Sequence, residues 1–210
     1  PDAEHRITTL AELAQAYPRE PVQASTDKES PRINSAYRAL IEAAPFFTIA
    51  SRSDKGLDCS PRGDGSNENG SLLQVLDDKH VCFADRRGNN RLDTLRNIIN
   101  DPHVGLLCLI PGLDMTLRLN GQAHISRDPK LLARFAMRTI EPSSVIVIRI
   151  DTVFFQCARA VMRAGLWDAQ RHIDTSGLPR AGDLLNSVID GFDGEKYEAE
   201  RPARQAASLY

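Results

Sequence analysis

Apolar residues along the chain fall mainly into short runs, and these runs predict β-strands. A turn signal at residues 54–56 predicts that residues 57–63 return beside the first run, and Pro111-Gly112 marks a second turn. Gly121, inside the apolar run at residues 115–125, indicates a β-bulge or a close backbone approach. Because most connections are short, we expect largely antiparallel pairing. The runs cover residues 46–52, 72–77, 80–85, 103–110, 115–125 and 144–155, the second and third as a hairpin.

Apolar residues at helical spacing occur in fewer places. Ser30-Pro31 is typical of a helix start, and the apolar positions within residues 33–41 then lie on one helix face. Residues 91–99 form another predicted helix, with Asn89 or Asn90 as the expected N-cap. Further helices are predicted over 128–137 and 182–190, and a frayed tail over 201–210.

This order of elements predicts an α+β fold or an all-β barrel with helical insertions. The sequence has neither regular βαβ alternation nor a G-x-G-x-x-G motif, which argues against a Rossmann sheet. We divide the chain into an N-terminal polar and helical extension (1–30), a barrel domain (31–175) and a C-terminal helical extension (176–210). The sequence shows no long apolar run and no secretory signal at its polar N-terminus, so the expected location is the cytoplasm.

Composition and charge narrow the classes of partner. The chain has 210 residues, 41% of them hydrophobic and 26% charged, with a net charge of −2, which is typical of a globular domain and not of a duplex-DNA-binding protein. Aromatic residues make up only 6%, which argues against a nucleic-acid-binding barrel that stacks bases. Arginine supplies 21 of the 26 basic residues. That bias suits phosphate or carboxylate recognition, although a GC-rich coding sequence would produce it too.

The cysteines and histidines form no metal-binding or disulfide pattern. The four cysteines are widely spaced and the five histidines are scattered, so we expect no metal site. Cys82 and Cys108 lie within apolar runs and are expected to be small core residues. The sequence contains no Ser-His-Asp signature with supporting context, and we assign no catalytic residue.

Two polar clusters interrupt the predicted strands. Residues 84–91 carry Arg86, Arg87 and Arg91 at or before a predicted helix N-terminus, where free backbone N–H groups and the helix dipole favour an anion. The alternative is a solvated loop whose asparagines cap the helix. In the other cluster, residues 59–70, Arg62 stands between Pro61 and Gly63 beside Asp64. That cluster fits close approach of a planar ligand, or a surface turn with a local Arg62–Asp64 contact.

The clusters and the strands between them, in this order, resemble the pyridoxamine 5′-phosphate oxidase-like superfamily of flavoproteins. The resemblance covers roughly residues 35–170 and includes FFTIASRSDKGLDCSPRGD, HVCFADRRGNNRLDTLRNIINDPHVGLLCLIPG and TLRLNGQAHI. The segments SPRGD, DRRGNNR and QCARA, followed by Leu166-Trp167, resemble one bacterial subgroup of largely unassigned function. The resemblance implies a mainly β fold with helical additions, the antiparallel FMN-binding split β-barrel.

The resemblance also implies that FMN binds non-covalently at the interface of a homodimer. The strand that carries Arg62 is expected along the flavin ring, and the phosphate clamp is expected at residues 89–91. Asn90 stands where the family has an arginine, and Arg86 or Arg87 is a candidate to supply that charge. The expected cofactor-binding residues are Arg62, Gly63, Asp64, Ala84, Asp85, Arg86, Asn89, Asn90 and Arg91, with Thr116 and Arg118 reaching the flavin from the second subunit and Gln156 and Arg159 as ring or substrate contacts.

The function implied is an FMN-dependent oxidoreductase of unknown substrate, in which the cofactor carries the redox chemistry. Trp167 and Arg171 are present, but the closing Arg-Leu-x-Pro element of true pyridoxamine 5′-phosphate oxidases is not, so we do not expect pyridoxamine phosphate as the substrate. The alternative is a non-catalytic flavin or tetrapyrrole carrier. For a tetrapyrrole, His80 and His124 lie in predicted strands without a supporting motif. A local polar turn is the alternative for Gln156 and Arg159.

Overall fold

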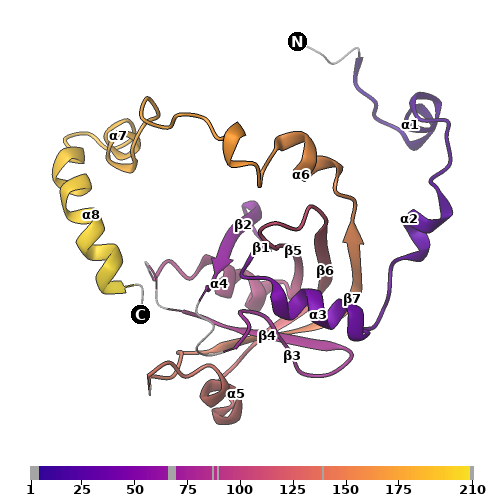
Figure 1. The fold of residues 1–210 in the computed structure, drawn as a ribbon, viewed down its shortest axis with the longest axis horizontal. Coiled ribbons are helices and arrows are strands. Elements are labelled where there is room, and N and C mark those ends of the chain that lie inside the picture. Colours follow the sequence, from indigo (N-terminus) through magenta and orange to yellow (C-terminus); the bar gives the residue numbers. More distant parts are fainter. Residues whose placement is uncertain (1–4, 66–69, 87, 89, 139, 209–210) are drawn as a thin grey trace.

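A single antiparallel sheet of seven strands forms the centre of the molecule (Figure 1). The computed structural model describes residues 5–65, 70–86, 88, 90–138 and 140–208. The strand order is β2-β1-β5-β6-β7-β4-β3, with every neighbouring pair antiparallel. The strands are β1 (Phe46–Ser53), β2 (Gly56–Gly63), β3 (Gln74–Val75), β4 (His80–Ala84), β5 (His103–Leu109), β6 (Thr116–Ser126) and β7 (Val145–Gln156). The predicted mainly β, antiparallel fold is confirmed.

Helices lie between and beyond the strands. Those near the sheet are α3 (Ser35–Ala43), α4 (Asp93–Asn100), α5 (Pro129–Arg134) and α6 (Arg159–Ala164). The more distant ones are α1 (Leu10–Ala16), α2 (Gln23–Asp27), the short 3₁₀ helix η3 (Ala169–Arg171), α7 (Ala181–Asn186) and α8 (Gly194–Ser208). Helix α5 begins as predicted, since the Asp128 carboxylate accepts the backbone N–H of Lys130 at 2.9 Å and proline follows at the first helical position.

The predicted helix start at Ser30-Pro31 is wrong. Helix α3 begins after Asn34, whose side chain accepts the backbone N–H of Tyr37 at 2.9 Å. Ser30 is instead paired with β7, because its backbone exchanges hydrogen bonds of 3.0 and 2.9 Å with Val153. Beside this bridge, the ammonium of Lys28 lies 4.8 Å from the ring centroid of Phe155. The backbone of Ser30 therefore pairs with the sheet and does not start a helix.

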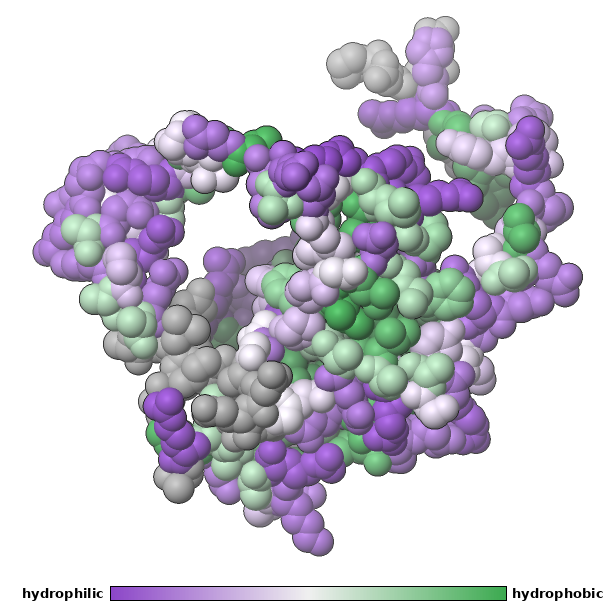
Figure 2. All heavy atoms as spheres, viewed as in Figure 1, coloured by the Kyte–Doolittle hydropathy of each residue, from purple (hydrophilic) through white to green (hydrophobic). Residues whose placement is uncertain are grey.

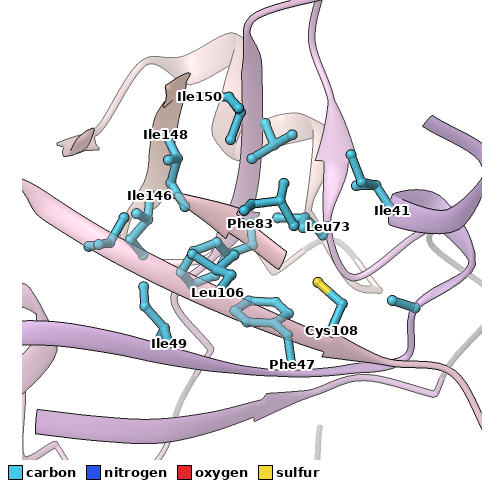
Figure 3. Packing of buried hydrophobic residues seen from close by; sticks show 14 of the residues in the cluster. Ile41, Phe47, Ile49, Leu73, Phe83, Leu106, Cys108, Ile146, Ile148 and Ile150 are labelled. Atoms are coloured by element: carbon cyan, nitrogen blue, oxygen red, sulfur yellow. The ribbon is translucent and has the colours of Figure 1, made fainter. Parts of the chain in front are cut away.

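Most of the buried apolar residues form one cluster on one face of the sheet (Figure 3), and a smaller cluster that includes Cys82 packs beside α5. Phe47 of β1 and Phe83 of β4 are fully buried and meet edge to face, with ring centroids 5.0 Å apart. Cys82 and Cys108 are buried as predicted, and burial raises the pKa of the Cys82 thiol to about 11 and that of Cys108 to about 12. These two thiols are therefore protonated packing groups.

The two ends of the chain extend away from the sheet (Figure 1). Helix α1 buries none of its residues, and Figure 2 shows hydrophilic side chains over most of α8. The frayed tail predicted from residue 201 is wrong, since α8 continues to Ser208. It packs on α7 through a close approach in which the Gly182 N–H donates to Glu198 at 2.7 Å.

No helix in the described part of the chain has the length and apolar character needed to cross a membrane. The boundaries at 30/31 and 175/176 stay predictions.

Gly121 marks the irregularity predicted in the longest hairpin. The register between β6 and β7 shifts at Asn120/Gly121, and a Cβ at Gly121 would lie 2.2 Å from the Arg149 carbonyl oxygen. Both the bulge and the close backbone approach expected from the sequence are confirmed. This contact lies between the two most extensively paired strands, so the barrel tolerates no side chain there.

We therefore expect Gly121→Ala to lower the free energy of unfolding, by about 1–3 kcal/mol or more, because the new methyl group must displace strand backbone. Urea denaturation monitored by circular dichroism measures the change. Gly177→Ala is the matched control, since a Cβ there meets nothing within 4 Å. Equal midpoints for the two variants would contradict this interpretation of the bulge.

Candidate functional site

A cleft of about 750 Å³ opens where β2, the segment after β4 and the first turn of α4 come together. The two polar clusters, far apart in the sequence, thus face one another. Of the predicted cofactor-binding residues, the cleft is lined by Arg62, Gly63, Ala84, Asp85, Arg86, Asn90 and Arg91. Asp64 lies beside it, in a small adjoining hollow that also contacts Ala84 and Arg86. Asn89, and Arg87 with it, lie outside the described residues.

Arg62 is held in a fixed position by neutral partners. Its Nη1 donates to Ser60 Oγ at 3.0 Å and its Nη2 to Thr94 Oγ1 at 3.1 Å. The two hydroxyl oxygens are themselves 3.1 Å apart. Burial lowers the Arg62 pKa, while the negative charges of Asp85 and Asp58 oppose that shift. Among the described residues no carboxylate forms an ion pair with Arg62, so its charge is directed at the cleft.

The local Arg62–Asp64 contact considered from the sequence is not formed. Asp64 lies 3.6 Å from Arg86 Nη2, and its own backbone N–H donates to the Pro45 carbonyl at 3.0 Å. Arg86 also donates through Nη1 to the Phe135 carbonyl at 2.7 Å. Arg86 therefore ties the segment after β4 to the end of β2 and to the end of α5.

The segment leading into α4 has an unusual backbone. Asn90 has φ 57° and Leu92 has φ 59°, both in the left-handed region that non-glycine residues seldom occupy. Leu92 is the N-cap of α4 and makes no side-chain capping bond, so the predicted Asn90 cap is wrong. The chain turns at residues 90–92 and brings Arg91 to the cleft. Asn90 therefore lies two residues before the N-cap position of α4. Leu92 therefore offers the first amides of α4 no capping side chain, and these amides can serve an anion.

Arg91 is the most exposed cation of the cleft. Its side chain is 78% exposed and contacts the Asp93 carboxylate, which raises the Arg91 pKa. An exposed pair of this kind contributes little stability, so Arg91 can exchange its partner for an incoming anion at small cost. Helix α4 itself is fixed by a buried hydrogen bond of 3.0 Å from Asn97 Nδ2 to Ser51 Oγ.

Asp85 follows β4 directly and lines the same cleft as Arg62. Its backbone N–H donates to the Ser144 carbonyl at 3.0 Å. Burial raises the pKa of its carboxyl group, and the positive charge of Arg62 counteracts only part of that effect. The cleft therefore contains a cation and a carboxyl group that are both partly desolvated.

The remaining predicted site residues do not reach this cleft. Thr116 and Gln156 are register partners where β6 meets β7, and the Arg118 guanidinium lies 5.1 Å from the ring centroid of Phe154. Arg159 is the first residue of α6 and is exposed. These four residues thus group on a separate surface of the chain, around the β6–β7 pair.

Sequence reasoning missed Ser60 and Thr94, the partners that position Arg62. Ser60 could have been found from strand alternation, because residues two apart on a strand share a face. Thr94 had no such signal, since its contact with Ser60 joins segments 34 residues apart. Within the described residues no group of three or more histidine, cysteine or acidic side chains is arranged to hold a metal ion.

The raised pKa of Asp85 predicts a pH-dependent difference between the wild type and Asp85→Asn. The folded protein binds the Asp85 proton more tightly than the unfolded chain, so this group contributes less stability as the pH rises through its two pKa values. Asparagine does not titrate. The variant should gain stability relative to the wild type as the pH rises from below the ordinary aspartate pKa toward neutrality. Parallel urea titrations across that range measure it, and a constant difference would refute the assignment.

Comparison with solved structures gives several neighbours of low sequence identity. The HupZ protein of Group A Streptococcus is 17% identical with a TM-score of 0.48, covering 59% of this chain and 93% of that one. A Lactobacillus delbrueckii protein provisionally named a pyridoxamine 5′-phosphate oxidase is 18% identical with a TM-score of 0.46, covering 60% and 95%. General Stress Protein 26 of Bacillus anthracis is 18% identical with a TM-score of 0.40, covering 56% and 88%. No curated protein matches the chain.

The family model described as pyridoxamine 5′-phosphate oxidase matches residues 33–157, which is more than half of the 210 residues. The matched range runs from the segment before α3 to the end of β7 and contains the whole sheet. It also contains every described residue of the cleft. The resemblance drawn from the sequence motifs is confirmed, and the chain belongs to the pyridoxamine 5′-phosphate oxidase family.

Proposed function

We propose that this chain binds FMN in the cleft between β2 and α4 and acts as an FMN-dependent oxidoreductase. The observation that supports it most is the convergence of Arg62, Arg91 and the N-terminus of α4 on one cleft. The cleft volume of about 750 Å³ falls within the range of small-molecule sites. An anionic, planar ligand with a phosphate at one end fits this combination of charge and space.

The phosphate end is proposed to bind at the entry to α4. The uncapped amides of the first turn and the helix dipole favour an anion there. The left-handed residues Asn90 and Leu92 flank Arg91, and alternation of this kind turns backbone N–H groups toward a common point. Arg91 would exchange Asp93 for the phosphate. Arg86, which is tied to Asp64 and Phe135, is proposed to brace the segment and not to act as the missing clamp charge.

The ring end is proposed to lie along β2. Arg62 offers a guanidinium already oriented by Ser60 and Thr94, so little side-chain entropy is lost when a ligand accepts from it. FMN, when bound, supplies hydride or electron transfer. The partly buried Arg62 favours negative charge on the group beside it, which is the electrostatic assistance such chemistry needs. The substrate is left open.

We also propose a homodimer in which Thr116, Arg118, Gln156 and Arg159 complete the cleft of the partner subunit. Their position around β6 and β7, outside the cleft of their own chain, supports this arrangement. Leu107 of β5 pairs with Arg118 across the sheet and is only half-buried, and Phe155 is 39% exposed. A sheet surface that mixes apolar side chains with arginine suits a subunit interface.

A cytoplasmic location is proposed on the basis that all four cysteines are free thiols.

For a tetrapyrrole, an axial histidine would be needed at the cleft, and none lies among its described lining residues. The Nδ1 atom of His80 lies 3.0 Å from a carboxylate oxygen of Asp77, at the turn between β3 and β4. The cofactor we propose is therefore FMN.

The experiment that tests the proposal is an absorbance spectrum of the purified chain, with mass identification of anything released by heating and light scattering for its size. The expected result is a yellow dimer that releases FMN and is bleached anaerobically by a nicotinamide. Retained FMN without reduction by any donor would favour a carrier over an enzyme. A colourless protein that does not take up added FMN would refute the cofactor assignment.

Arg91→Ala should weaken FMN binding, because the charge-assisted hydrogen bond to the phosphate is lost. Riboflavin, which lacks the phosphate, should be affected much less. Fluorescence titration of both ligands measures this, with Arg127→Ala as the control because Arg127 is an exposed arginine outside the cleft. If Arg91→Ala retains FMN through dialysis as the wild type does, the phosphate site lies elsewhere.

A further inference from the structure

The Asp85 side chain is partly buried in the cleft and has no polar partner among the described residues. Among the described residues, no hydrogen bond or ion pair involves its carboxylate, and its backbone amide is the group bonded to Ser144. The other acidic residues at the end of β2 and the start of α4 are paired. Asp64 contacts Arg86, and Asp93 contacts Arg91. Asp85 thus differs from Asp64 and Asp93, but it shares with Asp58, which also lines the cleft, the lack of a hydrogen bond or ion pair among the described residues.

Arg62 does not satisfy Asp85. The guanidinium donates to Ser60, Thr94 and the Pro61 carbonyl, and it interacts with Asp85 only through the longer-range attraction between their charges. The cleft thus presents a fixed donor and an unpartnered acceptor, both on one lining surface. A ligand edge that carries an acceptor and a donor would satisfy both groups.

The ionised form of Asp85 lowers the stability of the folded protein. Burial disfavours the charged form, which is why the carboxyl pKa is raised. A carboxylate that forms no hydrogen bond or ion pair among the described residues, and that is partly desolvated within a cleft, is best explained by a ligand that it binds. An ionised carboxylate can only accept hydrogen bonds, so the ligand group opposite it must be a donor.

We propose that the Asp85 carboxylate accepts a hydrogen bond from a donor group of the bound flavin and so determines which ligands the cleft retains. This inference rests on the proposed FMN site. The flavin offers two sources of donor, the N–H of its ring and the hydroxyl groups of its ribityl chain. Asp85 is a specificity-determining residue in this proposal, and it takes no part in the phosphate clamp.

The test compares Asp85→Asn with the wild type in fluorescence titrations with riboflavin, FMN and lumiflavin, which has the ring without the ribityl chain. The variant should bind riboflavin roughly 3- to 30-fold more weakly, because the asparagine amide oxygen still accepts a hydrogen bond but lacks the negative charge. Weaker lumiflavin binding assigns the donor to the ring N–H. Unchanged lumiflavin binding together with weaker riboflavin binding assigns it to the ribityl hydroxyls.

Asp58→Asn is the charge-matched control, because Asp58 also lines the cleft and carries the same charge. Removing a negative charge near a phosphate should leave FMN binding equal or tighter by electrostatics alone. Opposite effects of the two variants therefore separate a specific hydrogen bond from a general change in charge. Equal or tighter riboflavin binding by Asp85→Asn would overturn the inference.

Thermal melting of the flavin-free proteins supplies a second readout. Asp85→Asn should melt at a higher temperature near neutral pH, since it removes a desolvated charge. A lower melting temperature would show that Asp85 supports the fold and would overturn the inference as well. Failure of the proposed function is recognised separately. In that case the wild type itself binds no flavin, whereas failure of this inference alone leaves wild-type flavin binding intact.

Discussion

The packing of α4 against the β1–β2 hairpin is the constraint on which the cleft depends. A buried Asn97–Ser51 hydrogen bond fixes the middle of the helix, and the contact between Thr94 and Ser60 fixes its first turn. The first bond joins two buried side chains, and the second joins the buried Thr94 to the half-buried Ser60. Both are costly to break because a buried partner would be left unsatisfied. They determine where Arg62 and the helix N-terminus lie relative to each other, and therefore the distance between the two charged ends of the site.

Much of the fold could be predicted from the sequence, because the strands have apolar runs and strong turn signals. The bulge at Gly121 and the start of α5 follow from the same local rules. The predictions that were wrong concern places where distant contacts override local preference. Ser30 pairs with β7 instead of starting a helix, and α8, which packs against α7, continues through residues 201–208.

The candidate site could likewise be predicted from the sequence only in part. Its arginines could be found from the sequence because they cluster next to glycine and a helix start. Their different roles could not be found, because these depend on partners contributed by other elements. Arg86 braces the segment after β4 through Asp64, whereas Arg62 keeps its charge directed at the cleft, held by Ser60 and Thr94. Exposure and partners, which only the three-dimensional arrangement supplies, distinguish an arginine paired with other elements from one whose charge faces the cleft.

The bridge between Ser30 and Val153 also bears on aggregation. Strand β4 pairs with β7 only as far as Arg149, so the second half of β7 would present unpaired backbone groups on that side. Lys79 and Ser30 supply the hydrogen bonds there, at Ile150 and Val153. An open edge of this length is a template for pairing with another chain. The short segment before α3 thus covers this edge of β7, which is rich in β-branched residues, and blocks its pairing with a strand of another chain.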